Sequence, residues 1–174
     1  ELTRLASIDP LTGLRNRQSL EADLAQLHAT CARHGRRYSL AMCDVDHFKS
    51  YNDSQGHLAG DDALRSIGST LALVARRSDS VYRYGGEEFL IVLSEEHPDG
   101  AFAGAERLRR SISDLALPHP ASQERVITLS VGIAGYDPAR PSTGREVLES
   151  ADAALYQAKA EGRNRVVSSC PDPG

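Results

Sequence analysis

The sequence predicts an α+β domain in which helices flank a mainly antiparallel central sheet, and three observations support this prediction. The run 39–45 is apolar almost throughout and ends on acids, which is typical of a central strand buried on both faces. A Gly85-Gly86 pair separates two extended runs, as in a β-hairpin. Helical stripes and strands follow one another without the regular βαβ alternation of a parallel sheet.

Length, charge and cysteine usage limit the possible functions. A chain of 174 residues suits one domain with a single core. The formal net charge of −4 offers no general footprint for a nucleic-acid polymer or a membrane surface, so an anionic ligand must be held locally. The 3 cysteines lack metal-ligand spacing and fit a reducing cytoplasm, with Cys43 expected in the core. The only methionine is Met42, so we expect a piece of a longer protein, whose membrane tethering the sequence leaves open.

The first half of the chain is expected to contain a connector, a central strand and three helical segments. Helical spacing over residues 1–8 predicts the end of a connector helix, which Pro10 and Gly13 interrupt. The next helix is predicted by an apolar stripe with a period near 3.6, formed by Leu20, Leu24, Leu27 and Cys31. After the strand come a short helical piece over 47–54, a turn over 56–60, and a helix whose stripe is Leu64, Ile67, Leu71 and Val74.

The second half begins with the hairpin and ends in a helix and a tail. Asp99 is expected to cap a helix whose buried stripe is Ala101, Ala105, Leu108 and Ile112. Alternation of apolar and small polar residues over 127–133 predicts a strand with one face in the core. Thr143 and Glu146 have the spacing of a capping box, and the helix they open ends at Gly162. We place the main domain over 9–167 and expect a disordered tail over 168–174.

Acidic side chains gather at one predicted edge of the sheet. Asp44 closes the central strand, while Glu87 and Glu88 follow the two glycines of the hairpin, where a type I′ turn would need positive φ at both glycines. If the two strands are neighbours, these carboxylates can share a hard divalent cation, and Gly86 lets a nucleotide approach the backbone. Paired carboxylates on a palm-like sheet are typical of two-metal nucleotidyl transfer. The alternative is a solvated hairpin whose acids are simply exposed.

The motifs of the chain, taken together, resemble the GGDEF domain of bacterial diguanylate cyclases from residue 9 to about 167. The resemblance is carried by five segments in the family's order: 9–14 with 16–17, 44–49 with 52–53, 56–57 with 60–61, the tip 85–89, and 159 with 162–164. Glu87 stands where the family name has aspartate, a common variant that keeps an oxygen ligand. The resemblance implies a palm-like fold and an enzyme that condenses two GTP into cyclic di-GMP and two pyrophosphates, each domain of a homodimer presenting one GTP.

The resemblance also implies roles for the acids and cations. Asp44, Glu87 and the backbone carbonyl of Val45 would bind Mg²⁺ or Mn²⁺, two ions per active half-site. Glu88 would take the proton from the attacking 3′-hydroxyl, with a second metal-ligand role as the alternative. Lys49 would stabilise the charge that develops on the phosphates, and Lys159 and Arg163 would bind the β- and γ-phosphates. Cations in the last turn of a helix can instead simply complement its dipole.

Selectivity for guanine is implied by Asn52 and Asp61. A carboxylate accepts hydrogen bonds from guanine N1–H and the N2 amine, whereas adenine offers neither donor. Asp61 also argues against the branch of the family that makes mixed adenine-guanine dinucleotides. The other implied contacts are with Gly85 and Gly86, the pocket walls Phe48 and Leu64, and His57. Without the motif, Asp61 reads as an acid favoured at a helix start and Asn52 as a helix-end residue.

Product inhibition is implied by a second constellation, Arg76 and Asp79 with Arg107. Arginine forks suit phosphate and guanine edges, so bound cyclic di-GMP there would hold domains in a nonproductive arrangement. The alternative is a local ion pair that contributes little to stability.

Two other function classes stay open: a receptor that binds GTP or cyclic di-GMP without turnover, and a different nucleotidyl transferase or nucleotide cyclase on the same scaffold. We expect a cytoplasmic domain with no direct membrane contact.

Overall fold

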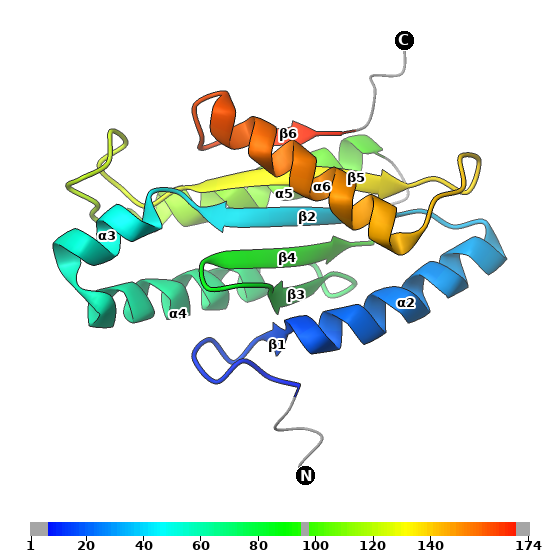
Figure 1. Cartoon of the computed structure of the whole chain (residues 1–174), viewed down its shortest axis with the longest axis horizontal. Helices are drawn as coiled ribbons and strands as arrows, with labels where there is room; N and C mark the ends of the chain where they lie inside the picture. Colours follow the sequence, from blue (N-terminus) through cyan, green and yellow to red (C-terminus); the bar gives the residue numbers. More distant parts are fainter. Residues whose placement is uncertain (1–6, 95–97, 170–174) are drawn as a thin grey trace.

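A mixed sheet of six strands organises the described part of the chain (Figure 1). The computed structural model describes residues 7–94 and 98–169. The strand order is β1-β3-β4-β2-β5-β6. The strands are β1 (Arg15–Asn16), β2 (Tyr38–Val45), β3 (Ser80–Arg83), β4 (Glu88–Leu93), β5 (Leu129–Tyr136) and β6 (Val166–Ser168). The helices are α2 (Arg17–His34), α3 (Phe48–Gln55), α4 (His57–Val74), α5 (Pro98–Asp114) and α6 (Gly144–Ala160).

The predicted antiparallel sheet is confirmed at its centre and needs correction at its edges. Strand β2 pairs antiparallel with β4 and with β5, and β3 pairs antiparallel with β4. The edge pairs β1–β3 and β5–β6 are parallel, so the sheet is mixed. These edge strands have 2 and 3 residues, too few to give an alternating sequence pattern.

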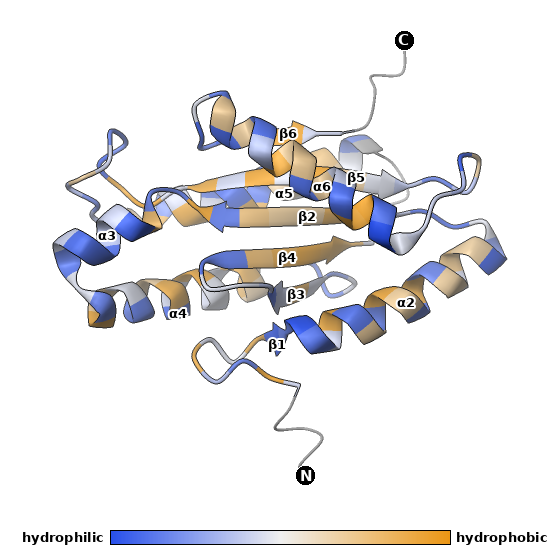
Figure 2. Cartoon of the chain, viewed as in Figure 1, coloured by the Kyte–Doolittle hydropathy of each residue, from blue (hydrophilic) through white to orange (hydrophobic). Residues whose placement is uncertain are grey.

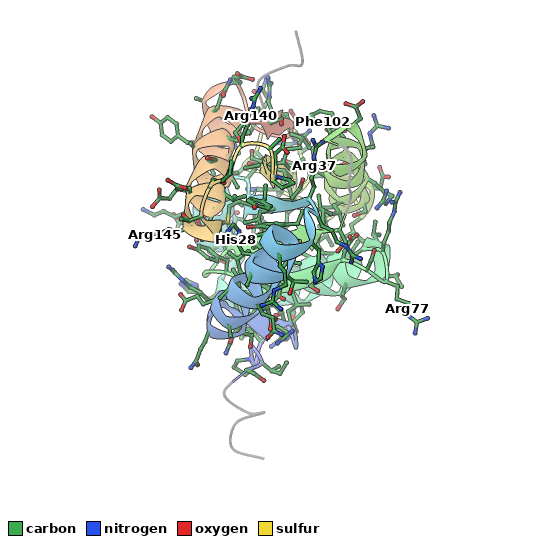
Figure 3. All side chains as sticks on the ribbon, turned by 90° about the vertical axis from the view of Figure 1, so that its right-hand side faces the viewer. His28, Arg37, Arg77, Phe102, Arg140 and Arg145 are labelled. Atoms are coloured by element: carbon green, nitrogen blue, oxygen red, sulfur yellow. The ribbon has the colours of Figure 1, made fainter. Side chains whose placement is uncertain are left out.

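Helices cover both faces of the sheet, and each face has its own apolar cluster. Helices α4 and α5 pack on one face, against Cys43, Phe89 and Val131, while α2 and α6 pack on the other. Figure 3 shows the two helix layers on opposite sides of the sheet, and Figure 2 shows the hydrophobic residues of β2 and β4 between them. All eight residues of β2 are buried, as its unbroken apolar run predicted.

Close packing of α6 on the sheet depends on Gly132 of β5. A Cβ atom at this position would lie 2.1 Å from the backbone nitrogen of Leu155 and 2.3 Å from the backbone oxygen of Ala151. Both contacts are with helix backbone, which cannot give way as a side chain can. The predicted capping box fixes the start of α6: Glu146 N–H donates to Thr143 Oγ1 at 3.1 Å, and Thr143 N–H donates to Glu146 Oε2 at 2.7 Å.

Several predicted boundaries differ from the structure. Residues 56–60 are not a turn, because Gly56, at φ 91°, is followed at once by the first residue of α4. Residues 1–6 of the expected connector helix lie outside the described residues, and Ile8 forms a β-bridge with Arg15. Ser168 belongs to β6, and residues 170–174 of the expected tail also lie outside the described part. None of the helices in the described part is long and apolar enough to cross a bilayer.

Candidate active site

The carboxylates of β2 and of the hairpin meet at one end of the sheet. Asp44 lies directly opposite Glu88 in the antiparallel register of β2 and β4. The backbone N–H of Val45 donates to the carbonyl oxygen of Glu87 at 3.1 Å, which fixes the tip of the hairpin to the end of β2. Asp44 is 6% exposed, whereas Glu87 and Glu88 are half-buried. The expected proximity of these strands is therefore confirmed.

Gly85 is required by the position of the Glu88 carboxylate. A Cβ atom on Gly85 would lie 2.4 Å from Glu88 Oε2, whereas one on Gly86 would meet nothing within 4 Å. Neither glycine has a positive φ, so the expected type I′ turn is wrong. The turn is instead closed by Tyr84 and Gly85, whose N–H groups both donate to the carbonyl oxygen of Glu88, at 2.8 and 3.1 Å. Gly85 is therefore needed for space rather than for backbone freedom.

A largely buried ion pair connects the hairpin tip to the turn that precedes α2. Arg83 donates to both carboxylate oxygens of Asp9, at 3.1 and 3.0 Å, and to the carbonyl oxygens of Gly85 and Gly86, at 3.1 and 2.7 Å. Burial raises the pKa of Asp9, but hydrogen bonds from Thr12 and Arg83 outweigh this and leave the pKa below its ordinary value of 3.8. The sequence motif drew attention to Asp9, but nothing in it indicated Arg83 as the partner.

The carboxylates of the site hold their protons more tightly than ordinary acids. Burial raises the pKa of Asp44, and the hydrogen bond and charge of Lys159 partly oppose the rise. Burial and then the charge of Asp44 raise the pKa of Glu87 and of Glu88. Lys159 Nζ lies 2.9 Å from Asp44 Oδ2. The cluster therefore carries an excess of negative charge that a further cation would relieve.

The predicted metal ligands come near one another without forming a closed cage. Among the described residues, no group of three or more His, Cys, Asp or Glu side chains is gathered closely enough to hold a metal ion. The chemistry of the donor set nevertheless fits a hard divalent cation, since the groups are carboxylates and the charge of Asp44 raises the pKa of both Glu87 and Glu88. A solvated hairpin with unrelated acids would not show this effect of Asp44 on both glutamates.

Asp46 is a second buried acid, and it serves a different purpose. It is 3% exposed and accepts hydrogen bonds from Thr128 Oγ1 at 2.7 Å, Ser130 Oγ at 2.6 Å and the backbone N–H of Asn164 at 3.1 Å. Burial raises its pKa, while these hydrogen bonds and the charge of Arg163 lower it. The sequence places Asp46 at the end of the buried strand and within the motif over 44–49, but it predicts no role for this acid.

The turn after α6 brings Arg163 to the same end of the sheet. The Arg163 guanidinium opposes the rise in the pKa of Asp44 that burial causes, so its charge acts on the carboxylates. It makes no hydrogen bond to any other residue of the described part. Lys49, in the first turn of α3, is exposed and likewise makes no hydrogen bond or ion pair within the described ranges. Both cations are therefore available to an anionic ligand.

The predicted guanine readers lie on the neighbouring helices α3 and α4. Asn52 Oδ1 is buried and has no hydrogen-bond partner among the described residues. A Cβ atom on Gly60 would overlap this oxygen at 1.8 Å, so only glycine leaves space for it. Asp61 follows Gly60 in α4 and is half-buried. An unsatisfied buried acceptor beside an acid is a suitable place for a ligand that carries N–H donors.

Of the remaining predicted contact residues, two are buried in the core and one is exposed on the surface. Phe48 and Leu64 are 6% and 3% exposed and belong to the apolar cluster under α4. His57 is exposed at the first position of α4. A groove of about 930 Å³ runs between α2 and α6 to Glu88, over Met42. Glu88 is the one predicted site residue among the described residues that line it.

Two residues of the predicted inhibitory site lie in one turn at the end of α4. Asp79 N–H donates to the carbonyl oxygen of Arg76, while the Asp79 carboxylate accepts from the N–H groups of Arg76 and Ser94, at 2.9 and 3.2 Å. Arg107 is half-buried on α5, the helix that packs beside α4. Asp79 therefore closes the turn through its hydrogen bonds, in addition to any contact that it makes with a ligand.

Comparisons with known proteins identify the family of the chain. Residues 6–165 match the family model described as diguanylate cyclase, GGDEF domain. The probable diguanylate cyclase DgcC of Escherichia coli K12 is 38% identical over 161 residues, which are 92% of this chain and 43% of DgcC. The chain thus spans less than half the length of that relative.

Solved structures give the same result for the fold. The crystal structure of the coiled coil and GGDEF domain of DgcB from Caulobacter crescentus, in complex with c-di-GMP, has a TM-score of 0.87 and 36% identity, and the match covers 96% of this chain and 87% of the chain in that structure. The active GGEEF domain of a Vibrio cholerae diguanylate cyclase has a TM-score of 0.79 and 32% identity, covering 90% of this chain and 98% of that one. The chain belongs to the GGDEF family of diguanylate cyclase domains.

Proposed function

We propose that this domain is a diguanylate cyclase, which condenses two GTP molecules into cyclic di-GMP and two pyrophosphates. One observation carries the proposal: Asp44 and Glu88 are directly opposed, with Lys159 paired to Asp44 and the guanidinium of Arg163 acting on the same carboxylate. Carboxylates that face cations at the open end of a sheet suit the transfer of a phosphoryl-bearing group. The family to which the chain belongs supports this choice among nucleotidyl transfers.

The reaction joins the 3′-hydroxyl oxygen of one GTP to the α-phosphorus of the other, and the bond from that phosphorus to pyrophosphate breaks. Glu88 takes the hydroxyl proton, for which its raised pKa is suited. Lys49, Lys159 and Arg163 compensate the charge on the triphosphate. Asp44, Glu87 and the carbonyl of Val45 would hold Mg²⁺ or Mn²⁺, which supplies Lewis-acid stabilisation of phosphate oxygens. A second transfer closes the ring.

Recognition of guanine is assigned to Asn52 and Asp61. The unpaired Asn52 Oδ1 can accept a hydrogen bond from the base, and the Asp61 carboxylate accepts from N1–H and the N2 amine. Loss of these acceptors should reduce discrimination against ATP more than it reduces turnover. Each domain offers one GTP, so two copies of the chain have to meet as a homodimer for the two transfers.

The test is incubation of the purified domain with GTP and Mg²⁺ at high protein concentration, with the products separated by chromatography and identified by mass. The control is the double variant Glu87→Gln, Glu88→Gln, which keeps side-chain size and removes two charges. Cyclic di-GMP from the parent and none from the control would support the cyclase. If even an artificially dimerised domain makes no product but binds cyclic di-GMP, the domain is a receptor instead.

Product inhibition is proposed for Arg76, Asp79 and Arg107. Support comes from their spacing: Arg76 and Asp79 lie in the turn that follows α4, and Arg107 lies on α5, the helix that packs beside α4. Arg76→Ala should weaken inhibition by added cyclic di-GMP without lowering the uninhibited rate. Unchanged inhibition in that variant would contradict the assignment of Arg76 to an inhibitory product site.

A further inference from the structure

The turn that carries Arg163 has a backbone conformation that its residues rarely adopt. Arg163 and Asn164 have φ angles of 65° and 46°, in the left-handed region that glycine usually occupies. Two successive non-glycine residues in this region persist only where the surroundings hold them. The contacts of this turn should therefore show what holds it.

Asn164 is fixed by two separate anchors. Its backbone N–H donates to Asp46 Oδ2 at 3.1 Å, and its side-chain oxygen Oδ1 accepts from Arg109 Nη1 at 2.6 Å. Both anchors are held in turn. Asp46 also accepts two hydroxyl hydrogen bonds from β5 and the residue before it. Arg109, whose side chain is 15% exposed, is clamped by two 3.0 Å hydrogen bonds to Glu106 on α5.

Ending the helix does not require these anchors. Gly162, at φ 119°, and the hydrogen bond from Arg163 N–H to the carbonyl oxygen of Ala158, at 2.9 Å, already terminate α6 in an ordinary way. The bonds to Asn164 are additional and join three elements, β2, α5 and the turn. The Arg163 guanidinium makes no hydrogen bond to another described residue, so the backbone of the turn is what fixes the point from which this side chain extends.

We propose that Asp46 and Arg109 are positioning residues which, through Asn164, hold Arg163 at the triphosphate end of the active site. The inference rests on the proposed function and deepens it, since it assigns the support of the residue that binds the β- and γ-phosphates. Neither Asp46 nor Arg109 touches the nucleotide. They act by fixing the turn, so their loss should weaken contacts with the outer phosphates and spare those with the base.

Two variants isolate the anchor on α5. Arg109→Met removes the donor to Asn164, while Asn164→Gly removes the acceptor and leaves a residue that adopts left-handed φ without strain. Arg110→Met is the matched control, because Arg110 also pairs with Glu106, at 3.3 Å, but is 71% exposed and has no bond to Asn164. Thermal unfolding of each variant would show that the fold is retained.

The readout is calorimetric binding of two probes that do not react. One is a GTP analogue with a methylene group between the α- and β-phosphates, and the other is GMP, which lacks the outer phosphates. We expect Arg109→Met and Asn164→Gly each to weaken binding of the analogue by about tenfold, since a misplaced charged hydrogen bond costs about that much. GMP affinity should not change, and Arg110→Met should match the parent with both probes.

The outcomes separate this inference from the proposed function. Equal loss of affinity for both probes would mean general loosening of the fold, and unchanged affinity for the analogue would mean that the anchor is unnecessary; either result overturns the inference. A double variant that loses the sum of the single effects would also overturn it, because residues acting through one bond are not additive. A parent that binds the analogue but makes no cyclic di-GMP overturns only the proposed function. A parent that binds neither probe overturns both.

Discussion

Replacement of Gly85 by alanine should abolish most activity while leaving the fold intact. The added Cβ would lie 2.4 Å from Glu88 Oε2, and real Cβ atoms essentially never approach another atom closer than 3.0 Å. Gly85 has no positive φ, so alanine adopts its backbone conformation without strain. The Glu88 carboxylate, at the end of a flexible side chain, therefore has to retreat by roughly 1 Å, and a displacement of that size costs about a hundredfold in rate.

The assay is the initial rate of cyclic di-GMP formation at saturating GTP, followed by chromatography, together with thermal unfolding. Gly85→Ala should lower kcat by about a hundredfold and change the free energy of unfolding by less than about 1 kcal/mol, because only a half-buried carboxylate moves. Gly104→Ala in α5 is the control. Its Cβ would meet Leu93 Cδ2 at 3.7 Å, an ordinary contact, so we expect full activity and a gain of about 0.5–1 kcal/mol.

The reasoning would be refuted if Gly85→Ala kept the parent's kcat. That result would mean that the Glu88 carboxylate is not needed where the structure holds it, and Glu88 could not be the group that takes the proton. If Gly85→Ala unfolded, the expectation that the clash affects only the carboxylate of Glu88 would also be contradicted.

Three further predictions concern stability. Arg83→Met should lower the free energy of unfolding by about 2–4 kcal/mol at pH 7, because it removes one partner of a largely buried ion pair. Since the folded-state pKa of Asp9 is lowered, this loss should shrink as the pH falls from above 3.8 through that lower value. Urea unfolding at several pH values would measure the change. Glu87→Gln should raise the melting temperature of the metal-free domain at pH 7, and the gain should disappear as the pH falls through the raised pKa of Glu87 toward 4.5. Thr143→Ala should cost about 1 kcal/mol in urea unfolding through loss of the capping box, with kcat unchanged.

Each of these predictions has an outcome that contradicts it. A pH-independent loss in the Arg83 variant would show that the charge of Asp9 is not involved. A Glu87 variant less stable than the parent at pH 7 would mean that the carboxylates do not repel one another. An unaffected Thr143 variant would mean that α6 is held by packing alone.

The central elements were predictable because their patterns are long and regular. The buried run of β2, the stripe of α5 and the capping box of α6 each follow from local periodicity or cap chemistry, and all three are confirmed. The edge strands were not predictable, because two or three residues carry no period. The turn at 56–60 was misread because a helix can start directly after a glycine at positive φ.

The site was predictable in its motif residues and not in its supports. Asp44, Glu87 and Glu88 are brought together because β2 ends, and the antiparallel strand β4 begins, at the same end of the sheet. The ion pair of Arg83 with Asp9 spans 74 positions, and the hydrogen bond of Arg109 with Asn164 spans 55. Long-range polar contacts of this kind depend on the assembled tertiary structure and leave no local pattern in the chain.

The short outer strands of the sheet have a consequence for solubility. An exposed sheet edge offers unpaired N–H and C=O groups on which another chain can add a strand, and so it invites aggregation. Here the outermost strands β1 and β6 have only 2 and 3 residues, so each offers a short edge, although β6 covers only residues 131–133 of β5. A domain proposed to meet its own copy is especially exposed to such mispairing. Its short outer strands limit pairing through the backbone and give the side-chain surface the larger part in how two copies come together.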